Sequence, residues 1–79
     1  MEYRTHNIRL AEFILARGSK VPEIRGQRDR AEFVFDDPDG KLGWELELFR
    51  ADEPILVQQF IWAQRELRAQ MDRKFGPRQ

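Results

Sequence analysis

Apolar and polar side chains alternate most clearly over residues 30–36, which predicts a β-strand. One side of this strand carries Ala31, Phe33 and Phe35, and the other carries Glu32, Val34 and Asp36. The next four residues, Asp37-Pro38-Asp39-Gly40, predict a tight turn, because Pro suits its first central position and Gly its left-handed position. Two phenylalanines on one side require a cover, which we expect from helices on either side of the strand in the sequence.

A first helix is predicted over residues 8–17. Either Asn7 or Thr5 suits its N-cap, and Gly18 suits the left-handed position that ends many helices. Its apolar side carries Leu10, Ala11, Phe13, Ile14 and Leu15. We expect this side to be buried.

The segment Ser19–Arg25 is predicted to be a weaker strand. Pro22 lacks an amide donor, which places the strand at an edge of the sheet. A polar turn over Gly26–Asp29 then leads into the strand Arg30–Asp36. The two segments predict an antiparallel β-hairpin whose second strand is the inner one.

Residues 42–49 fit two structures. Leu42, Trp44, Leu46 and Leu48 alternate with Gly43 and glutamates, which is the pattern of a third strand. The same run has no β-branched residue, and Leu and Glu are good helix formers. The pattern alone leaves strand and helix open.

The longest predicted element is a helix over residues 55–75, with Pro54 at its first turn and Gly76-Pro77 at its end. Its apolar stripe consists of Leu56, Phe60, Ala63, Leu67, Met71 and Phe75. We expect the core to join residues of the three clearest elements, namely Leu10, Ile14, Phe33, Phe35, Phe60 and Leu67. The predicted class is therefore α+β in one domain, residues 1–79: an N-terminal helix, an antiparallel hairpin, and a long C-terminal helix packed on the sheet.

Composition adds a bias toward association. The chain has 79 residues and no cysteine, so neither a disulfide nor a thiolate metal site can support its small core. Small domains without such links often gain stability from a second subunit. The charged first ten residues and the lack of a long apolar run predict neither a signal peptide nor a membrane segment, so we expect a cytoplasmic protein.

Charge is distributed in three blocks. Residues 1–30 carry seven bases and four acids, residues 31–53 two bases and eight acids, and residues 54–79 five bases and two acids. The blocks have net charges of +3, −6 and +3, and the whole chain is neutral. An acidic middle that neutralises two basic ends fits contacts within one subunit or between two. A segregated basic surface would instead suit nucleic acid.

Several blocks of the chain resemble a family of small bacterial and phage proteins that is classed as a domain of unknown function. The matching residues are Arg4-Thr5, Leu10-Ala11, Phe13-Ile14-Leu15-Ala16, Gly18, Phe33-Val34-Phe35-Asp36-Asp37-Pro38, Phe49, Phe60, Ala63, Arg65 and Leu67. Two places differ from the family pattern: Glu12 replaces an alanine, and Asp52-Glu53-Pro54 replaces a turn of the Asn-Gly type. The resemblance implies a helix over residues 41–50 and brings no catalytic residue.

Candidate catalytic groups are few. The chain has single copies of four residue types that commonly act in catalysis, namely Tyr3, Thr5, His6 and Ser19, and its glycines match no phosphate-binding fingerprint. An EF-hand registered on Gly40 would need acids at positions 35 and 46, where the chain has Phe35 and Leu46. We expect no enzymatic activity, metal site or cofactor, and the sequence indicates no small-molecule substrate.

Trp62 is the strongest candidate for a functional residue. At 100° per residue it lies about 200° from the centre of the apolar stripe of the last helix. The side chains around it are Gln58, Arg65, Ala69 and Arg73. Another element of the chain, a partner protein or second copy, or a nucleic-acid base could cover the indole. We predict a non-enzymatic binding module that self-associates or binds a protein partner through the last helix, with nucleic-acid binding through the basic ends and Trp62 as the alternative.

Overall fold

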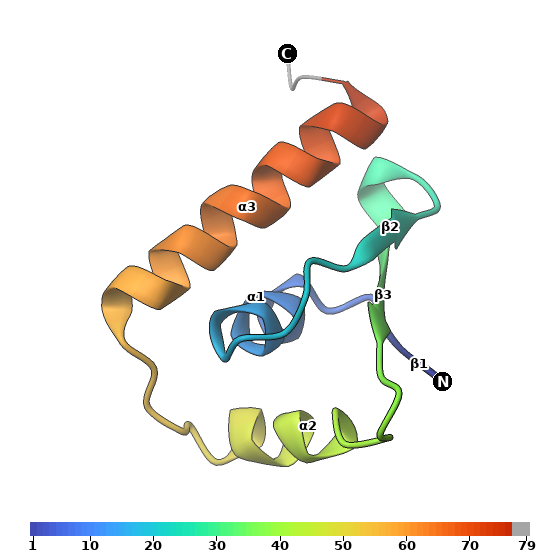
Figure 1. Ribbon diagram of the computed structural model, residues 1–79. Coiled ribbons are helices and arrows are strands. Elements are labelled where there is room, and N and C mark those ends of the chain that lie inside the picture. The colour runs from blue at the N-terminus through green and yellow to red at the C-terminus, as the bar shows by residue number, and fades with distance from the viewer. Residues whose placement is uncertain (77–79) are drawn as a thin grey trace.

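The computed structural model describes residues 1–76 and has an α+β architecture (Figure 1). In chain order the elements are β1 (Glu2–Thr5), α1 (Ile8–Ala16), β2 (Glu23–Arg25), a 3-10 helix η1 (Arg28–Arg30), β3 (Glu32–Asp36), α2 (Gly43–Arg50) and α3 (Val57–Phe75). Pro77 and Arg78, which belong to the predicted helix end and to the basic C-terminal block, lie outside the described residues. No helix within residues 1–76 is long and apolar enough to cross a membrane.

Three antiparallel strands form the sheet in the order β1-β3-β2. The predicted hairpin is confirmed, with β3 as its inner strand, although β2 covers only three residues of the predicted Ser19–Arg25. A third strand does exist, but it is β1 and not residues 42–49. Tyr3 of β1 lies opposite Phe35. Four residues with two charges among them are a weak local signal, so pairing with β3 is what makes β1 a strand.

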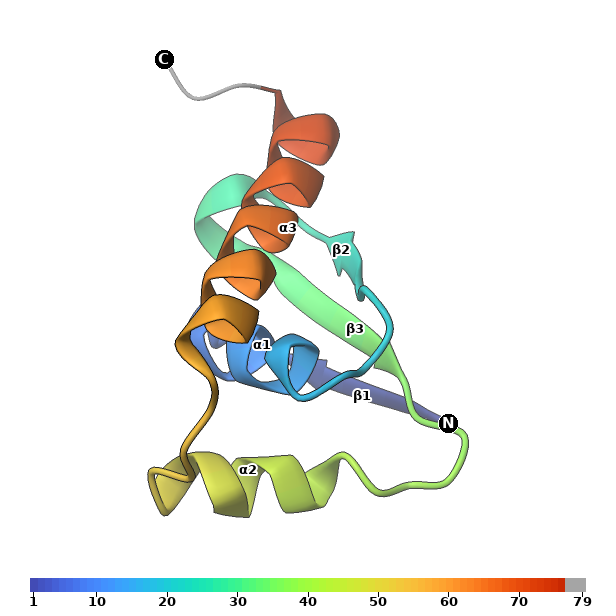
Figure 2. The ribbon, with the colours of Figure 1, turned by 60° about the vertical axis from the view of Figure 1, so that its left-hand side comes forward.

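The helix α1 is the middle layer of the molecule, with the sheet on one side and α3 on the other (Figures 1 and 2). Its N-cap is Asn7, whose side-chain oxygen accepts hydrogen bonds from the amides of Arg9 and Leu10 at 3.0 and 3.3 Å. Its buried side chains join those of the sheet and of α3 in one core, which includes Leu10, Ile14, Leu15, Phe33, Phe35, Ala63 and Leu67. The predicted packing of a long C-terminal helix on the sheet is confirmed, with α3 contacting β2 as well as α1.

Two predictions about the last helix are wrong. The helix begins at Val57, so Pro54 lies outside it, and Leu56 is 70% exposed at its N-cap. Ile55 packs against the core instead. Phe60 is only half-buried and lies outside the core cluster. The physical reason is that α1 lies between the sheet and α3, so α3 reaches the core through Ala63 and Leu67.

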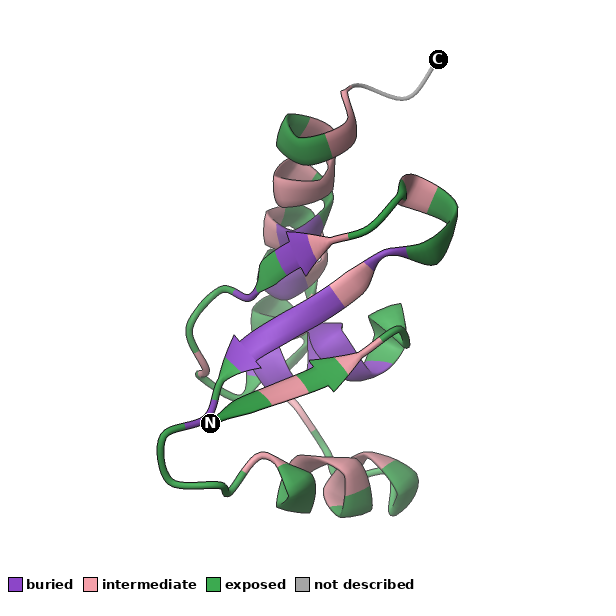
Figure 3. Ribbon diagram, turned by 90° about the vertical axis from the view of Figure 1, so that its right-hand side faces the viewer, coloured by how far each residue is buried: buried purple, intermediate pink, exposed green. Residues whose placement is uncertain are grey.

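Residues 43–50 form the helix α2, which excludes the predicted alternative of a strand over residues 42–49. Leu42, Leu46 and Phe49 pack against the core from one side of this segment, and the rings of Phe49 and Phe13 meet edge to face at 5.5 Å. Figure 3 shows that α2 itself carries only half-buried and exposed residues. This helix is therefore attached to the rim of the core.

The turn before α2 depends on a buried carboxylate. Asp37 accepts hydrogen bonds from the amides of Lys41, at 2.9 Å, and Leu42, at 3.3 Å. The amide of Gly40 donates to the carbonyl of Asp37 at 3.1 Å, as expected for the predicted turn. The side chain of Asp37 thus stabilises the backbone of this turn. Within residues 1–76 no group of three or more metal-ligating side chains is placed to hold a metal ion.

The connection from β2 to β3 is tighter than the predicted polar turn. Gly26 has a φ of +87°, and a Cβ atom there would lie 2.9 Å from the carbonyl oxygen of Arg30. Only glycine fits such a left-handed position beside the backbone. The chain then forms η1, so the strand β3 begins at Glu32 and not at Arg30.

Candidate functional site

The candidate site is the side of α3 that faces away from α1. We call it the outer face, and its predicted residues are Gln58, Trp62, Arg65, Ala69 and Arg73. Ala63 and Leu67 are the buried residues of this helix and point to the core. Residues about half a turn away from them must therefore point outward. This geometry follows from the helix period, so the sequence could predict it.

The structure exposes four of the five predicted partner-binding residues: Gln58, Trp62, Arg65 and Arg73. Ala69 is half-buried. The exposure of Trp62 is the decisive observation. The residue is 51% exposed, and no element within residues 1–76 covers it completely. Trp62 lies one turn after Gln58 and one turn before Arg65, so these side chains are neighbours on the helix surface.

Three further apolar residues extend this surface beyond the prediction. They are Leu56 and Val57, which are 70% and 71% exposed, and Ile61, which is 41% exposed. Ile61 lies one turn after Val57 and next to Trp62 in the sequence. The helix begins two residues later than the sequence predicts, so Leu56 lies at its N-cap and not in the apolar stripe to which the pattern assigns it.

The outer face carries exposed positive charge. In the part of the chain that the structure describes, neither Arg65 nor Arg73 has a carboxylate within 4.0 Å. The sequence suggests Glu45 and Glu47 as acids that a second copy could offer them. Glu45 forms an ion pair with Arg17 of its own chain, whereas Glu47 is exposed and lies 3.8 Å from an exposed Arg50. Of these two acids, only Glu47 remains accessible to another molecule.

The outer side of the sheet, by contrast, neutralises its own charges. Arg25 on β2 reaches across β3 to Glu2 on β1, at 3.5 Å, and also contacts Glu23 at 3.0 Å. The hydrogen bond from Arg4 lowers the pKa of Glu2, and the one from Arg25 lowers the pKa of Glu23. Beneath this network Val34 is buried, although the alternation predicts only that it lies opposite the phenylalanines.

The candidate base His6 and the candidate nucleophile Ser19 make structural contacts with nearby residues. His6 Nδ1 lies 3.2 Å from the carbonyl oxygen of Ala31. Its other ring nitrogen is 3.8 Å from the carboxylate of Glu32. Ser19, which follows α1, donates its hydroxyl to the carbonyl of Lys20 at 3.1 Å. These contacts tie neighbouring segments together and form no nucleophile–base pair.

Comparison of the chain with protein-family models, with curated proteins and with solved structures yields no match.

Proposed function

We propose that this protein is a non-enzymatic binding module that self-associates through the outer face of α3. The observation that carries this proposal is the half-exposed indole of Trp62, together with the exposed aliphatic side chains of Leu56, Val57 and Ile61 at the start of the same helix. Tryptophan and arginine are the residues most enriched at the energetic centres of protein interfaces. Covering the indole with a partner would recover about 2 kcal/mol of burial free energy.

The charge of the outer face favours an acidic partner surface. Two outer faces packed on each other would bring Arg65 and Arg73 toward arginines of the same charge, which opposes association. Residues 31–53 of this same chain have a net charge of −6 and include α2, where Trp44 is 72% exposed and Glu47 is exposed. A second copy that presents its α2 to the outer face offers the carboxylate of Glu47 and the apolar side chain of Trp44.

A charge exchange between Arg65 and Glu47 tests this arrangement. Arg65→Glu alone should weaken self-association, because it places a carboxylate against the partner's acids, and Glu47→Arg alone should weaken it for the opposite reason. An equimolar mixture of the two variants restores an opposite pair at each contact. Sedimentation equilibrium should therefore show larger species in the mixture than in either variant alone.

The matched control is Lys20→Glu, a charge reversal at an exposed residue in the connection between α1 and β2. It should leave self-association unchanged. A parent protein that stays monomeric at every concentration would contradict the proposal. A mixture that associates no better than its components would contradict the pairing of α2 with the outer face.

Nucleic-acid binding is the second candidate function. The observation in its favour is that Trp62, on which a base could stack, is exposed on the same helix as Arg65, one turn further on, and Arg73, about three turns further on. Contacts to phosphate would make affinity fall by roughly 0.9 log units per contact for each tenfold rise in salt on duplex DNA. Gel-shift or fluorescence titrations at low salt, with duplex and single-stranded probes, test this candidate, and absence of binding to both would remove it.

A further inference from the structure

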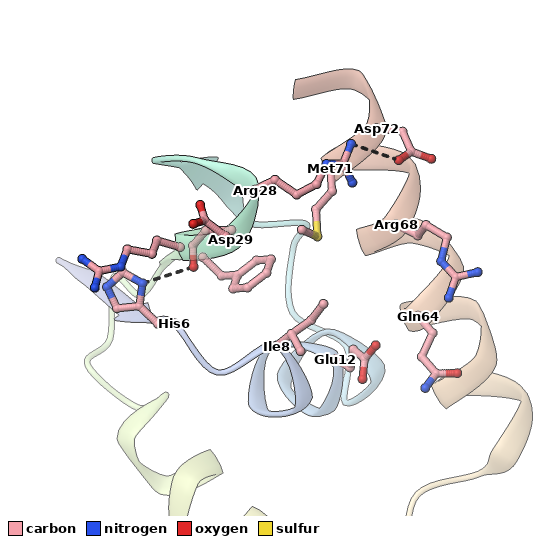
Figure 4. A pocket seen from close by; sticks show the side chains of 12 residues that line it. His6, Ile8, Glu12, Arg28, Asp29, Gln64, Arg68, Met71 and Asp72 are labelled. Carbon is pink, nitrogen blue, oxygen red and sulfur yellow. Dashed lines mark hydrogen bonds and ion pairs between the residues drawn. The ribbon is translucent and has the colours of Figure 1, made fainter. Parts of the chain in front are cut away.

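An open cavity of about 920 Å³ lies between the start of α1, η1 and the C-terminal half of α3 (Figure 4). Its apolar lining includes Ile8, Phe33 and Met71, and Glu12 and Gln64 are among its polar side chains. Small-molecule sites usually have volumes of about 300–1,000 Å³ and combine apolar walls with a few polar groups. None of the residues of the outer face lines this cavity, so the two sites can be tested separately.

The bridge between η1 and the end of α3 keeps one side of the cavity in place. Arg28 lies 3.7 Å from the carboxylate of Asp72, donates to the carbonyl of Gly76, and stacks over the ring of Phe75 at 5.8 Å. These contacts join the two segments across the cavity without filling it. The wall formed by α3 is therefore anchored at both ends, by the core and by Arg28.

Glu12 is the buried charge of the cavity. Its side chain is 8% exposed and projects from α1 toward α3 (Figure 4). One carboxylate oxygen accepts a long hydrogen bond of 3.4 Å from Arg9, whose own side chain is 66% exposed. The other oxygen accepts no hydrogen bond from residues 1–76, although a carboxylate has about four acceptor positions. This largely buried carboxylate is ion-paired with Arg9 through one oxygen, and its other oxygen stays open, so it can accept a cationic ligand.

The arginines around the cavity, unlike Glu12, are not buried. Arg28 already has Asp72 and a carbonyl as partners. Arg30 and Arg68 are exposed at the rim, where water solvates them. Arg68 makes no ion pair with Glu12 in the described part of the chain. Among the described residues that line the cavity, Glu12 is thus the one buried charged side chain, whereas Arg30 and Arg68 face solvent.

We propose that this cavity binds a small organic cation with an apolar body. The ammonium or guanidinium group of the ligand lies against the free oxygen of Glu12, and its apolar body packs on Ile8 and Met71. Charge-assisted hydrogen bonds of this kind are about twice as strong as neutral ones.

Three probes of the same length isolate the charge: 4-phenylbutylamine, 4-phenylbutan-1-ol and 4-phenylbutyric acid. Titrations followed by amide chemical shifts should show the amine binding about tenfold more tightly than the alcohol, because only the amine supplies a charged donor to Glu12. The acid should bind least. Equal affinities for amine and alcohol, tightest binding by the acid, or no binding by any probe would overturn the proposal.

Two variants separate charge from shape. Glu12→Gln keeps the size of the side chain and should abolish the preference for the amine over the alcohol, with a melting temperature that confirms the fold. Ile8→Ser should lower the affinity for the amine and for the alcohol to the same extent. Val21→Ser, at an equally exposed aliphatic residue outside the cavity, should change neither affinity. A preference for the amine that survives Glu12→Gln would show that the cation lies elsewhere. Loss of binding in Val21→Ser would show that the effect is unrelated to the cavity.

Discussion

The helices α1 and α3 pack against each other, yet they use their apolar residues in opposite ways. Seven of the nine residues of α1 are buried, whereas only Ala63 and Leu67 are buried among the nineteen residues of α3. The reason is position, because α1 lies between the sheet and α3 while α3 is the outermost layer (Figure 1). Apolar side chains on α1 stabilise the fold, and those on the outer face of α3 remain exposed to solvent.

The same substitution in the two regions should have very different effects. Leu15→Ala removes a fully buried side chain of α1 and should lower the free energy of unfolding by about 2–5 kcal/mol. Leu56→Ala, at the exposed start of α3, should change it by about 0.5 kcal/mol or less. Urea denaturation of both variants measures the difference, and similar losses in both would break the comparison.

Trp62→Ala should separate association from stability. If the outer face is an interface, the loss of a central tryptophan should weaken self-association about thirtyfold or more, which corresponds to about 2 kcal/mol. The free energy of unfolding of the dilute subunit should change by about 1 kcal/mol or less, since half of the side chain is already in water. A large loss in the free energy of unfolding, with an unchanged association constant, would instead assign Trp62 to the core.

Arg28→Ala should affect α3 more than α1. Its loss removes a half-buried ion pair with Asp72, a hydrogen bond to the carbonyl of Gly76 and a cation–π contact with Phe75, which together contribute about 1–2 kcal/mol. We expect amide hydrogen exchange to become faster in the last turn of α3 and to stay unchanged in α1. An equal increase in both helices would show that the two form one cooperative unit.

The smallest expected effect is the pH dependence of the charges on the sheet. Arginine contacts lower the folded-state pKa values of Glu2 and Glu23, so their contribution to stability is present above about pH 4.3, the usual pKa of a glutamate. It is lost as the pH falls through the lowered values. The difference in denaturation midpoint between the parent and Glu23→Gln should therefore shrink in acid, and a difference that grows would contradict the pairing with Arg25.

The candidate site was predictable only in part. Helical periodicity places Arg65 opposite Ala63 and Leu67, and Trp62 and Arg73 about 100–120° away from them, because 100° per residue holds in any helix. It does not determine where the helix begins, and a shift of two residues moves Leu56 from the expected core to the surface. The cavity at Glu12 was not predictable, since its lining comes from segments that are far apart in the sequence.

The sequence by itself determined the elements with strong local signals. Capping at Asn7, alternation across Phe33 and Phe35, and the turn before Gly40 depend on near neighbours in the chain, so local rules suffice. Only the tertiary structure decided the remaining elements. Residues 2–5 become a strand because they pair with the edge of β3 that β2 leaves open, and residues 43–50 become a helix attached by Phe49 to Phe13 of α1. In these segments the local preferences nearly balance, and contacts between residues distant in the sequence contribute the free energy that selects one structure.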